Sequence, residues 1–252
     1  MPIVPKSRPK QTREETTAIL TDHGVGSQGG VALLGVRGYY ADSMGVKGKN
    51  DHAMYDDALF VISPTAYASF NFNTDPQKAG QKKAKLAVGR YEFYKGKHKG
   101  KYNALRPFPE GIKLPCTRDG VTSMCSHTNI HKGGFNDTFS EGCQTVYPTQ
   151  YDEAIKLIYA EMSRYGQKTI PYLLVDEDST AHPDSNLPVD NLTTNTQPTA
   201  SATPEPSIYV VKQGDTLTKI ASVTQVSVSR LVSLNNLTDP NKLMVGQELK
   251  LR

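Results

Sequence analysis

The sequence predicts a mainly β first domain, a linker, and a small α+β domain at the carboxyl end. Three observations support this division. Short runs of β-branched and aromatic residues, separated by glycine, proline, asparagine and aspartate, fill most of residues 1–177. A stretch rich in threonine, serine and proline follows over residues 178–207. Residues 208–252 then alternate between strand and helix patterns, so we expect a second folded domain there.

The first domain should contain short strands and one long helix. The runs that favour strands are residues 32–36, 59–62, 86–88, 91–94 and 170–175. The helix is expected over residues 149–165, with Thr149 as its N-cap. Its apolar positions recur at helical spacing and lie on one face: Tyr151, Ala154, Ile155, Ile158, Tyr159 and Met162.

The segment 178–207 has the composition of a linker. It contains almost no large apolar residues, so it cannot bury enough surface to offset the entropy of the chain. Its prolines favour an extended and fairly stiff spacer. We therefore expect two domains that are tethered to each other.

The last segment has a strand, helix, helix, strand pattern. Tyr209 and Val211 alternate as one face of a strand, and a Gly-Asp turn follows. Thr216 can cap a first helix. The apolar residues of two helices then recur at helical spacing: Leu217, Ile220, Ala221 and Val223, followed by Val228, Leu231, Val232 and Leu234. Residues 248–251 form the closing strand, which gives a βααβ fold.

This segment resembles the LysM family. The resemblance rests on Tyr209, Val211, Gly214, Asp215, Thr216, Leu217, Ile220, Ala221, Leu231, Asn235, Leu237, Leu243, Gly246, Gln247 and Leu249. It implies binding of glycans that contain N-acetylglucosamine, as in peptidoglycan, through backbone groups and apolar contacts. The residues that it implies for this groove are Gly214, Asp215, Thr216, Leu217, Asn235 and Leu237.

Composition excludes several other classes of partner. The 29 basic and 25 acidic residues give a net charge of +4, without a basic stripe for nucleic acid. The apolar runs are far too short to insert into a membrane. The N-terminus lacks the apolar core of a secretory signal. A wall-directed chain of this kind is expected to be a phage product, made in the host cytoplasm and then released or carried in the virion. The alternative is an exported protein whose secretory signal has been removed from this sequence.

Three cysteines are an odd number, so a disulfide framework is not expected. Cys116 and Cys125 flank a polar loop and could either form a small bridge or pack as reduced residues. Cys143 follows Ser140, Glu141 and Gly142, in a segment that also contains His131.

Residues 129–145 contain the parts needed for nucleophilic catalysis by cysteine. Cys143 can supply the thiolate, for which we expect a lowered pKa, and His131 can act as general base and later as general acid. Gly142 lets the backbone turn, so that the amides of Gly142 and Cys143 can form an oxyanion hole. We expect Ser140 to support this turn by hydrogen bonding.

A histidine followed by Ser-x-Gly-Cys resembles the catalytic signature of the L,D-transpeptidase (YkuD-type) family. In that family histidine precedes cysteine, as His131 precedes Cys143. The resemblance implies a mostly β domain that acts on peptidoglycan stem peptides through an acyl-enzyme. Papain-like and NlpC/P60-type peptidases have the opposite order, and here only His182 follows Cys143.

Two features depart from the family pattern. The interval between His131 and Cys143 is 12 residues, which is shorter than usual in the family. The basic residue that commonly follows the cysteine is replaced by Gln144, which we expect to contact substrate through an uncharged hydrogen bond. Recognition of substrate carboxylates must then come from other positions, for which the candidates are Arg37, Arg106, Arg118 and Lys132.

We therefore predict a monomeric cysteine enzyme that hydrolyses stem peptides or crosslinks of peptidoglycan and is directed there by the LysM domain. It resembles a phage endolysin or a virion-associated hydrolase. The alternatives are an L,D-transpeptidase and a non-catalytic protein that either binds the cell wall or is a structural part of the virion. No cofactor is expected.

A zinc site is the remaining alternative. His127, His131, Cys125, Asp137 and Cys143 form a conceivable ligand set. The glycine pair at 133–134 argues against a helix that would place both histidines on one face, so we predict no metal. His98 is expected in a solvated turn, and His127 on the surface.

Overall fold

The computed structural model describes residues 3–26, 29–78 and 83–176, and shorter stretches within 208–251. The chain forms two compact units, which divide near residue 185. The expected linker lies outside the described residues. Each unit is considered separately below.

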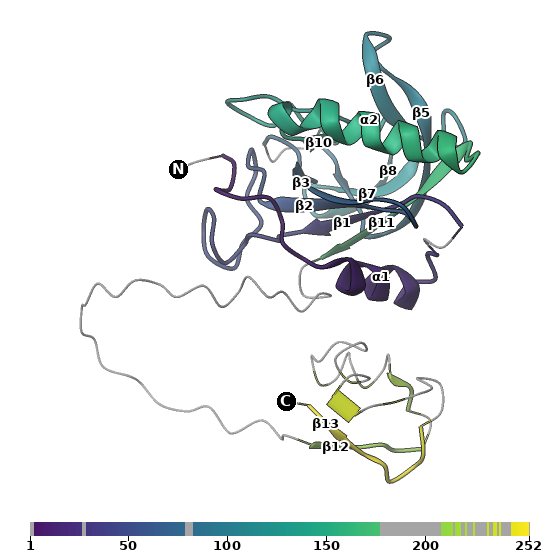
Figure 1. The fold of residues 1–252 in the computed structure, drawn as a ribbon. Coiled ribbons are helices and arrows are strands. Elements are labelled where there is room, and N and C mark those ends of the chain that lie inside the picture. The colour runs from purple at the N-terminus through teal and green to yellow at the C-terminus, as the bar shows by residue number, and fades with distance from the viewer. Residues whose placement is uncertain are drawn as a thin grey trace, which may run out of the picture. The chain divides into compact units, whose positions relative to one another are not determined.

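Eight strands of the first unit close into a barrel (Figure 1), which confirms the mainly β prediction. Their order around the barrel is β1, β11, β5, β6, β9, β10, β3 and β2. The bounds are β1 Ala32–Arg37, β2 Asp57–Ile62, β3 Tyr67–Asn73, β5 Gly89–His98, β6 Tyr102–Pro107, β9 Ile130–Lys132, β10 Gln144–Val146 and β11 Thr169–Asp176. Two neighbouring pairs are parallel, β1 with β11 and β9 with β10, and the other pairs are antiparallel.

A second sheet contains the short strands β4 Lys85–Leu86, β7 Leu114–Arg118 and β8 Val121–Cys125. A disulfide between Cys116 and Cys125 joins β7 to β8, with their Cα atoms 6.0 Å apart. Of the two alternatives for this pair, the structure has the bridge. Cys143 is the free cysteine.

The first helix, α1 Arg13–Asp22, is absent from the sequence prediction. A capping box holds its N-terminus. Thr12 Oγ1 accepts from the Glu15 amide at 3.2 Å, and the Thr12 amide donates to Glu15 Oε2 at 2.7 Å. This reciprocal pair satisfies two of the amides that a helix end leaves free.

The second helix, α2 Pro148–Arg164, corresponds to the helix predicted over 149–165. Its N-cap is Tyr147, so the expectation that Thr149 caps it is wrong. Pro148 takes the first helical position, because its fixed φ suits that position and its missing amide would have no partner there.

Two cores form on the two faces of the wall made by β1, β2 and β11, with α2 on one side and α1 on the other (Figure 1). Leu33 of β1 packs in the core that contains α2, and Leu34 packs in the core that contains α1. Since both faces are covered, every residue of β1 and β2 is buried.

Most predicted strands are confirmed. Residues 32–36, 59–62 and 170–175 lie within β1, β2 and β11, and residues 91–94 lie within the longer β5. The strand expected over 86–88 is displaced, because β4 ends at Leu86 and Val88 is exposed in a bend.

In the second unit, β12 Ile208–Val210 pairs antiparallel with β13 Glu248–Lys250, and Tyr209 lies opposite Leu249. Leu217, Ile220 and Leu231 are helical and buried. They pack with Val211, Leu249 and Leu251 into one small core. This agrees with the predicted βααβ pattern. Ala221, Val223, Val228 and Val232 lie outside the residues whose structure is described.

Candidate active site

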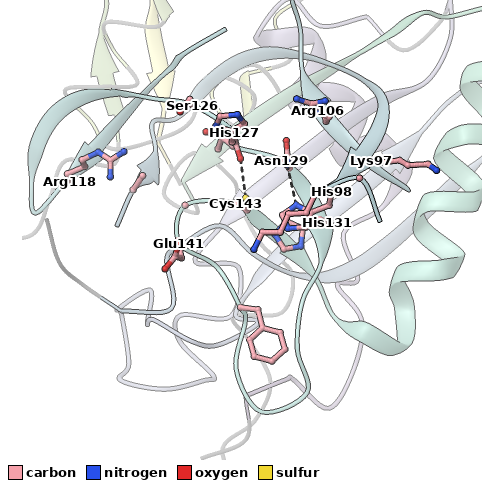
Figure 2. A pocket seen from close by; sticks show the side chains of 16 residues that line it. Lys97, His98, Arg106, Arg118, Ser126, His127, Asn129, His131, Glu141 and Cys143 are labelled. Atoms are coloured by element: carbon pink, nitrogen blue, oxygen red, sulfur yellow. Dashed lines mark hydrogen bonds between the residues drawn. The ribbon is translucent and has the colours of Figure 1, made fainter. Parts of the chain in front are cut away.

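A pocket of about 520 Å³ opens beside Cys143 (Figure 2). Residues from the β5–β6 hairpin, from β7 and from the segments before β9 and β10 line it. Its polar and charged lining consists of Lys97, His98, Lys99, Arg106, Arg118, Ser126, His127, Thr128, Asn129, His131, Glu141 and Cys143. The volume is within the range of small-ligand sites.

The parallel pairing of β9 with β10 brings the two predicted catalytic residues together. His131 of β9 is registered with Thr145 of β10, and Cys143 precedes Thr145 by two residues. Because side chains alternate along an extended chain, Cys143 and Thr145 tend toward the same face as His131. A ring nitrogen of His131 and Cys143 Sγ lie within 4.8 Å of each other. The 12-residue interval between His131 and Cys143 is thus spanned by the short connection between the parallel strands β9 and β10.

The turn before Cys143 requires glycine and uses Ser140. Gly142 has φ +143°, and a Cβ there would lie 2.8 Å from Ala84 Cβ. Ser140 Oγ donates to Cys143 O at 2.5 Å and accepts from the Gly142 amide at 3.2 Å.

These contacts correct the expected oxyanion hole. The Gly142 amide is already used by Ser140, so it does not point freely at a substrate. The amide of Cys143 donates to no acceptor among the residues described. One amide, rather than two, is therefore available from this turn.

His131 is buried and held in one orientation. Its Nδ1 lies 2.7 Å from Lys132 O and 3.2 Å from Tyr102 Oη. Since a carbonyl only accepts, Nδ1 carries the proton, and Nε2 is left with a lone pair. Burial, with a smaller contribution from the charge of His98, lowers the pKa of His131 to about 4. The ring is therefore a neutral base at pH 7.

Cys143 is half-buried, and its thiol donates to His127 O at 3.2 Å (Figure 2). Burial raises the pKa of this thiol, against smaller lowering contributions from the Asn129 backbone and the charge of Lys99. The expectation of a lowered pKa is therefore wrong for the free protein. The thiol is protonated at rest beside a neutral imidazole.

His98 does not lie in a solvated turn, which corrects the sequence prediction. It is half-buried at the end of β5, and its ring stacks on His131 with centroids 3.9 Å apart. Its Nδ1 lies 3.2 Å from Asn129 Nδ2. Burial lowers the pKa of His98. The side chain of His127 is exposed, as predicted.

Gln144 does not reach the pocket. It is fully buried, and its Oε1 accepts from the Tyr172 hydroxyl inside the barrel. Since side chains alternate along a strand, Gln144 turns inward where Cys143 faces the pocket. The expected contact between Gln144 and substrate is therefore wrong.

Two of the four candidate cations line the pocket. Arg106, which pairs with Glu110 at 2.9 Å, and Arg118 are both in its wall, together with Lys97 and Lys99. Glu141 is the single carboxylate among the described residues of the lining. Lys132 lies outside the pocket lining.

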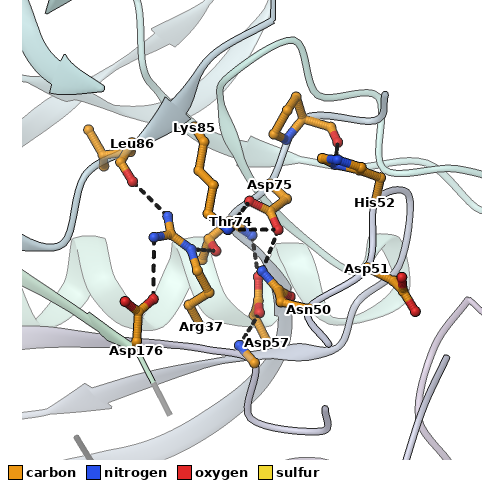
Figure 3. A network of polar contacts seen from close by, with 12 residues as sticks. Arg37, Asn50, Asp51, His52, Asp57, Thr74, Asp75, Lys85, Leu86 and Asp176 are labelled. Atoms are coloured by element: carbon orange, nitrogen blue, oxygen red, sulfur yellow. Dashed lines mark hydrogen bonds and ion pairs between the residues drawn. The ribbon is translucent and has the colours of Figure 1, made fainter. Parts of the chain in front are cut away.

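Arg37 belongs to a different, buried network (Figure 3). Its guanidinium donates to Thr74 Oγ1 at 2.9 Å and to Leu86 O at 2.7 Å, and pairs with Asp176 at 3.4 Å. It therefore holds β1 to neighbouring segments and does not line the pocket beside Cys143.

The five residues considered above as zinc ligands do not come together at one point in the structure. Cys125 is in the disulfide, and Asp137 accepts from Gln77 Nε2 at 2.9 Å. A different group of three donors comes together: His98, His131 and Cys143.

In the second unit, several of the expected groove residues support the fold. Leu217 is buried in the core, and Leu237 packs against it. Asn235 accepts from the Lys250 amide at 2.7 Å and donates to Leu231 O at 2.8 Å. Asp215 accepts from the Tyr209 hydroxyl at 2.8 Å. Thr216 is exposed, and Gly214 lies outside the described residues.

Residues 209–252 match the family model of the LysM domain, so the C-terminal segment is a LysM domain. The family resemblance drawn for the first unit remains a prediction. No solved structure matches the chain. No helix among the described residues is both long and apolar enough to cross a membrane.

Curated relatives match over short segments. The N-acetylmuramoyl-L-alanine amidase XlyA of Bacillus subtilis is 58% identical over 41 residues, which are 16% of this chain and 14% of the relative. The endolysin of Bacillus phage PZA is 55% identical over 44 residues, 17% of each chain. The probable endopeptidase p60 of Listeria welshimeri is 52% identical over 46 residues, 18% of this chain and 9% of the relative. The chain thus spans less than a fifth of the length of these relatives.

Proposed function

We propose that this chain is a peptidoglycan hydrolase that cuts stem peptides or crosslinks with Cys143 as nucleophile. The observation that carries the proposal is the approach of Cys143 Sγ to within 4.8 Å of a ring nitrogen of His131, inside a pocket of about 520 Å³. The LysM domain supports peptidoglycan as the polymer that is bound. Relatives named as an amidase and an endolysin agree with a lytic role.

In the acylation step, His131 Nε2 takes the proton of the Cys143 thiol while Sγ attacks the carbonyl carbon of the substrate. Both groups begin neutral, so the proton moves during the attack and no ion pair is needed beforehand. The Cys143 amide can donate to the oxyanion. When the C–N bond breaks, His131 returns the proton to the leaving amine, and a thioester remains.

In the second step, water attacks the thioester carbonyl while His131 takes a proton from the water. The C–S bond breaks, His131 returns that proton to Sγ of Cys143, and the peptide leaves with a new carboxyl group. His131 Nδ1 donates to Lys132 O and lies within hydrogen-bond distance of the Tyr102 hydroxyl. These contacts fix the ring through both steps. Hydrolysis therefore requires no residue beyond those that support acylation.

The lining of the pocket favours an anionic substrate. Among its described residues, four are cationic, Lys97, Lys99, Arg106 and Arg118, and one is a carboxylate, Glu141. Stem peptides carry free carboxylates, which arginine binds well because its donors match the two oxygens. Exposed Phe139 adds an apolar surface to the same wall. These residues replace the cation that the sequence lacks after Cys143.

The remaining features fit action at the cell wall. A LysM domain tethered to the catalytic unit raises the local concentration of that unit at the polymer. The bridge between Cys116 and Cys125 suits an oxidising compartment outside the cytoplasm. We place the chain's action there, as a phage-released or virion-associated protein that works as a monomer.

The proposal is tested by the loss of turbidity of purified sacculi. Wild type should clear the suspension. Cys143→Ser, which keeps the size and hydrogen bonding of the side chain, should not, because a serine hydroxyl is a far weaker nucleophile beside this base. Clearing by Cys143→Ser at the wild-type rate would contradict the proposal.

A further inference from the structure

Three potential metal ligands from separate segments meet at the pocket. His98 ends β5, His131 lies in β9, and Cys143 precedes β10. One ligand atom from each lies within 4.8 Å of the other two. No other such group of histidine, cysteine or carboxylate ligands occurs among the described residues.

The surroundings of His131 are those of a metal ligand. Its Nδ1 donates to Lys132 O at 2.7 Å, which leaves Nε2 with a lone pair. Histidines that bind metals almost always donate their other ring nitrogen to a carbonyl or carboxylate in this way. The contact fixes both the tautomer and the direction of the ring.

Asn129 can hold His98 in the same way. Asn129 is buried, and its Oδ1 has no hydrogen-bond partner among the residues described, while its Nδ2 lies 3.2 Å from His98 Nδ1. A side-chain amide fits equally well with its oxygen and nitrogen exchanged. In that orientation Oδ1 accepts from His98 Nδ1, which satisfies the buried oxygen and leaves His98 Nε2 with a lone pair.

The donor set suits zinc. Two imidazoles and one thiolate are ligands that zinc prefers, with Zn–N of about 2.0 Å and Zn–S of about 2.3 Å. Tetrahedral binding then requires donors separated by roughly 3.3–3.6 Å. Closing the group to this spacing needs a shift of about 1 Å, together with a turn of the stacked His98 and His131 rings that directs both lone pairs at the metal. The pocket leaves room for a water as fourth ligand.

We propose that His98, His131 and Cys143 form a zinc-binding site that holds the protein in an inactive state. On binding, a Zn–S bond forms and the thiol proton is released to the solvent, while both histidines bind through lone pairs. The metal occupies the sulfur and the nitrogen that acyl transfer would use. Zinc binding and attack on substrate therefore exclude each other.

Binding is measured on the full chain after removal of metal with a chelator. Zinc is titrated against a coloured competitor, and cobalt is used separately because a cobalt–thiolate bond absorbs strongly in the near ultraviolet. We expect one zinc per chain and a cobalt–thiolate band. His98→Ala should weaken zinc binding by at least about 100-fold and abolish the band, since the loss of a direct ligand should exceed the 10–100-fold cost of losing a residue that only orients a ligand.

His127→Asn is the matched control, because His127 also lines the pocket but does not belong to the group of three. Asparagine tolerates the positive φ of this position. It should bind zinc as wild type does. Melting temperatures show whether each variant is folded. Absence of zinc and cobalt binding in folded wild type, or equal loss in His98→Ala and His127→Asn, would overturn the site.

Substitution of Asn129 tests whether its side chain holds His98 in place for the metal. Asn129→Ala should weaken zinc binding by about 10–100-fold, because His98 loses its acceptor. Asn129→Asp should restore binding, because both of its side-chain ends are oxygens. Equal affinity in wild type and folded Asn129→Ala would contradict the role given to Asn129.

The inactive state is tested on sacculi. Zinc at saturating concentration should abolish clearing by wild type, and chelator should restore it. Activity that persists in the zinc-loaded protein overturns the inhibitory role. Activity that requires zinc also overturns that role, together with the cysteine mechanism under Proposed function, while the measured metal site would stand. Binding without any activity in either state leaves the site intact and contradicts the proposed function.

Discussion

The rings of His98 and His131 are stacked, with centroids 3.9 Å apart and planes 25° apart. Two protonated imidazoles would repel each other strongly at this distance, and burial further disfavours the charged form of each. The pair is therefore neutral at physiological pH. A neutral His131 can take a proton from Cys143 or bind a metal, but it cannot pair with a thiolate at rest.

The first prediction concerns the tautomer of His131. In chelator-treated protein at pH 7, nitrogen chemical shifts should show a neutral ring protonated at Nδ1. They should remain so down to about pH 5, since the pKa lies at about 4. The ionisable groups nearest to the ring are His98, Lys99 and Cys143. Protonation of His131 near pH 6.5 would show that burial and His98 do not act as described.

The second prediction concerns stability and pH. Burial, followed by repulsion between neighbouring carboxylates, raises the pKa of Asp56 and of Asp57. Both carboxyl groups therefore hold their protons to higher pH in the folded protein than in the unfolded chain, where the pKa is about 3.9. The stability that accompanies protonation is present below about pH 4 and is lost as pH rises through the raised pKa values of the pair.

Asp56→Asn should flatten this dependence. Asparagine can still accept from the Asp51 amide, which now donates to Asp56 Oδ2 at 2.8 Å, but it carries no charge. A pKa difference of one unit between the folded and unfolded states corresponds to about 1.4 kcal/mol. Between pH 5 and pH 8, the free energy of unfolding of the variant should therefore rise by more than about 1 kcal/mol relative to that of wild type. Urea unfolding measures this, with exposed Asp42→Asn as control. Parallel pH curves for wild type and Asp56→Asn would refute the prediction.

The third prediction concerns substrate carboxylates. Arg118→Gln should lower kcat/KM for soluble stem peptides by about 10–100-fold, the usual cost of losing a charged hydrogen bond. It should have little effect on peptides whose carboxylates are amidated. Lys132→Gln, outside the pocket lining, is the control. An equal loss on both kinds of peptide would indicate a structural role for Arg118.

The fourth prediction concerns the LysM domain. Deleting residues 207–252 should leave turnover of soluble muropeptides intact and reduce activity on whole sacculi, because tethering acts through local concentration. Salt should weaken the binding of sacculi by the LysM domain only modestly, because salt screens only the small electrostatic contribution to that binding. An equal fall in turnover on both substrates would mean that the LysM domain belongs to the catalytic site.

The fold could be predicted where apolar residues follow a simple period. The strands β1, β2 and β11 consist of apolar runs, and α2 has a regular apolar face. The strands β7 and β8 are short, partly polar and held by a disulfide, so their residues carry no such signal. The helix α1 had a signal in Thr12 and Glu15, which the apolar period alone does not reveal.

The site was predictable where its residues are close in sequence. His131 lies in β9, and Ser140, Gly142 and Cys143 belong to the connection from β9 to its parallel neighbour β10. His98 could not be found in this way, because only the barrel brings the β5–β6 hairpin over β9. Gln144 was misplaced, because a one-residue step along a strand reverses the face of a side chain.

If Cys143 and His131 cleave peptidoglycan, the products must depend on both side chains. Mass spectrometry of muropeptides from sacculi, digested in chelator by wild type, Cys143→Ala and His131→Ala, measures this dependence. We expect shortened or uncrosslinked peptides from wild type. Product should fall by about 10³-fold or more in Cys143→Ala and by about 10²–10⁴-fold in His131→Ala. The same products in equal amounts from all three proteins would contradict the assignment.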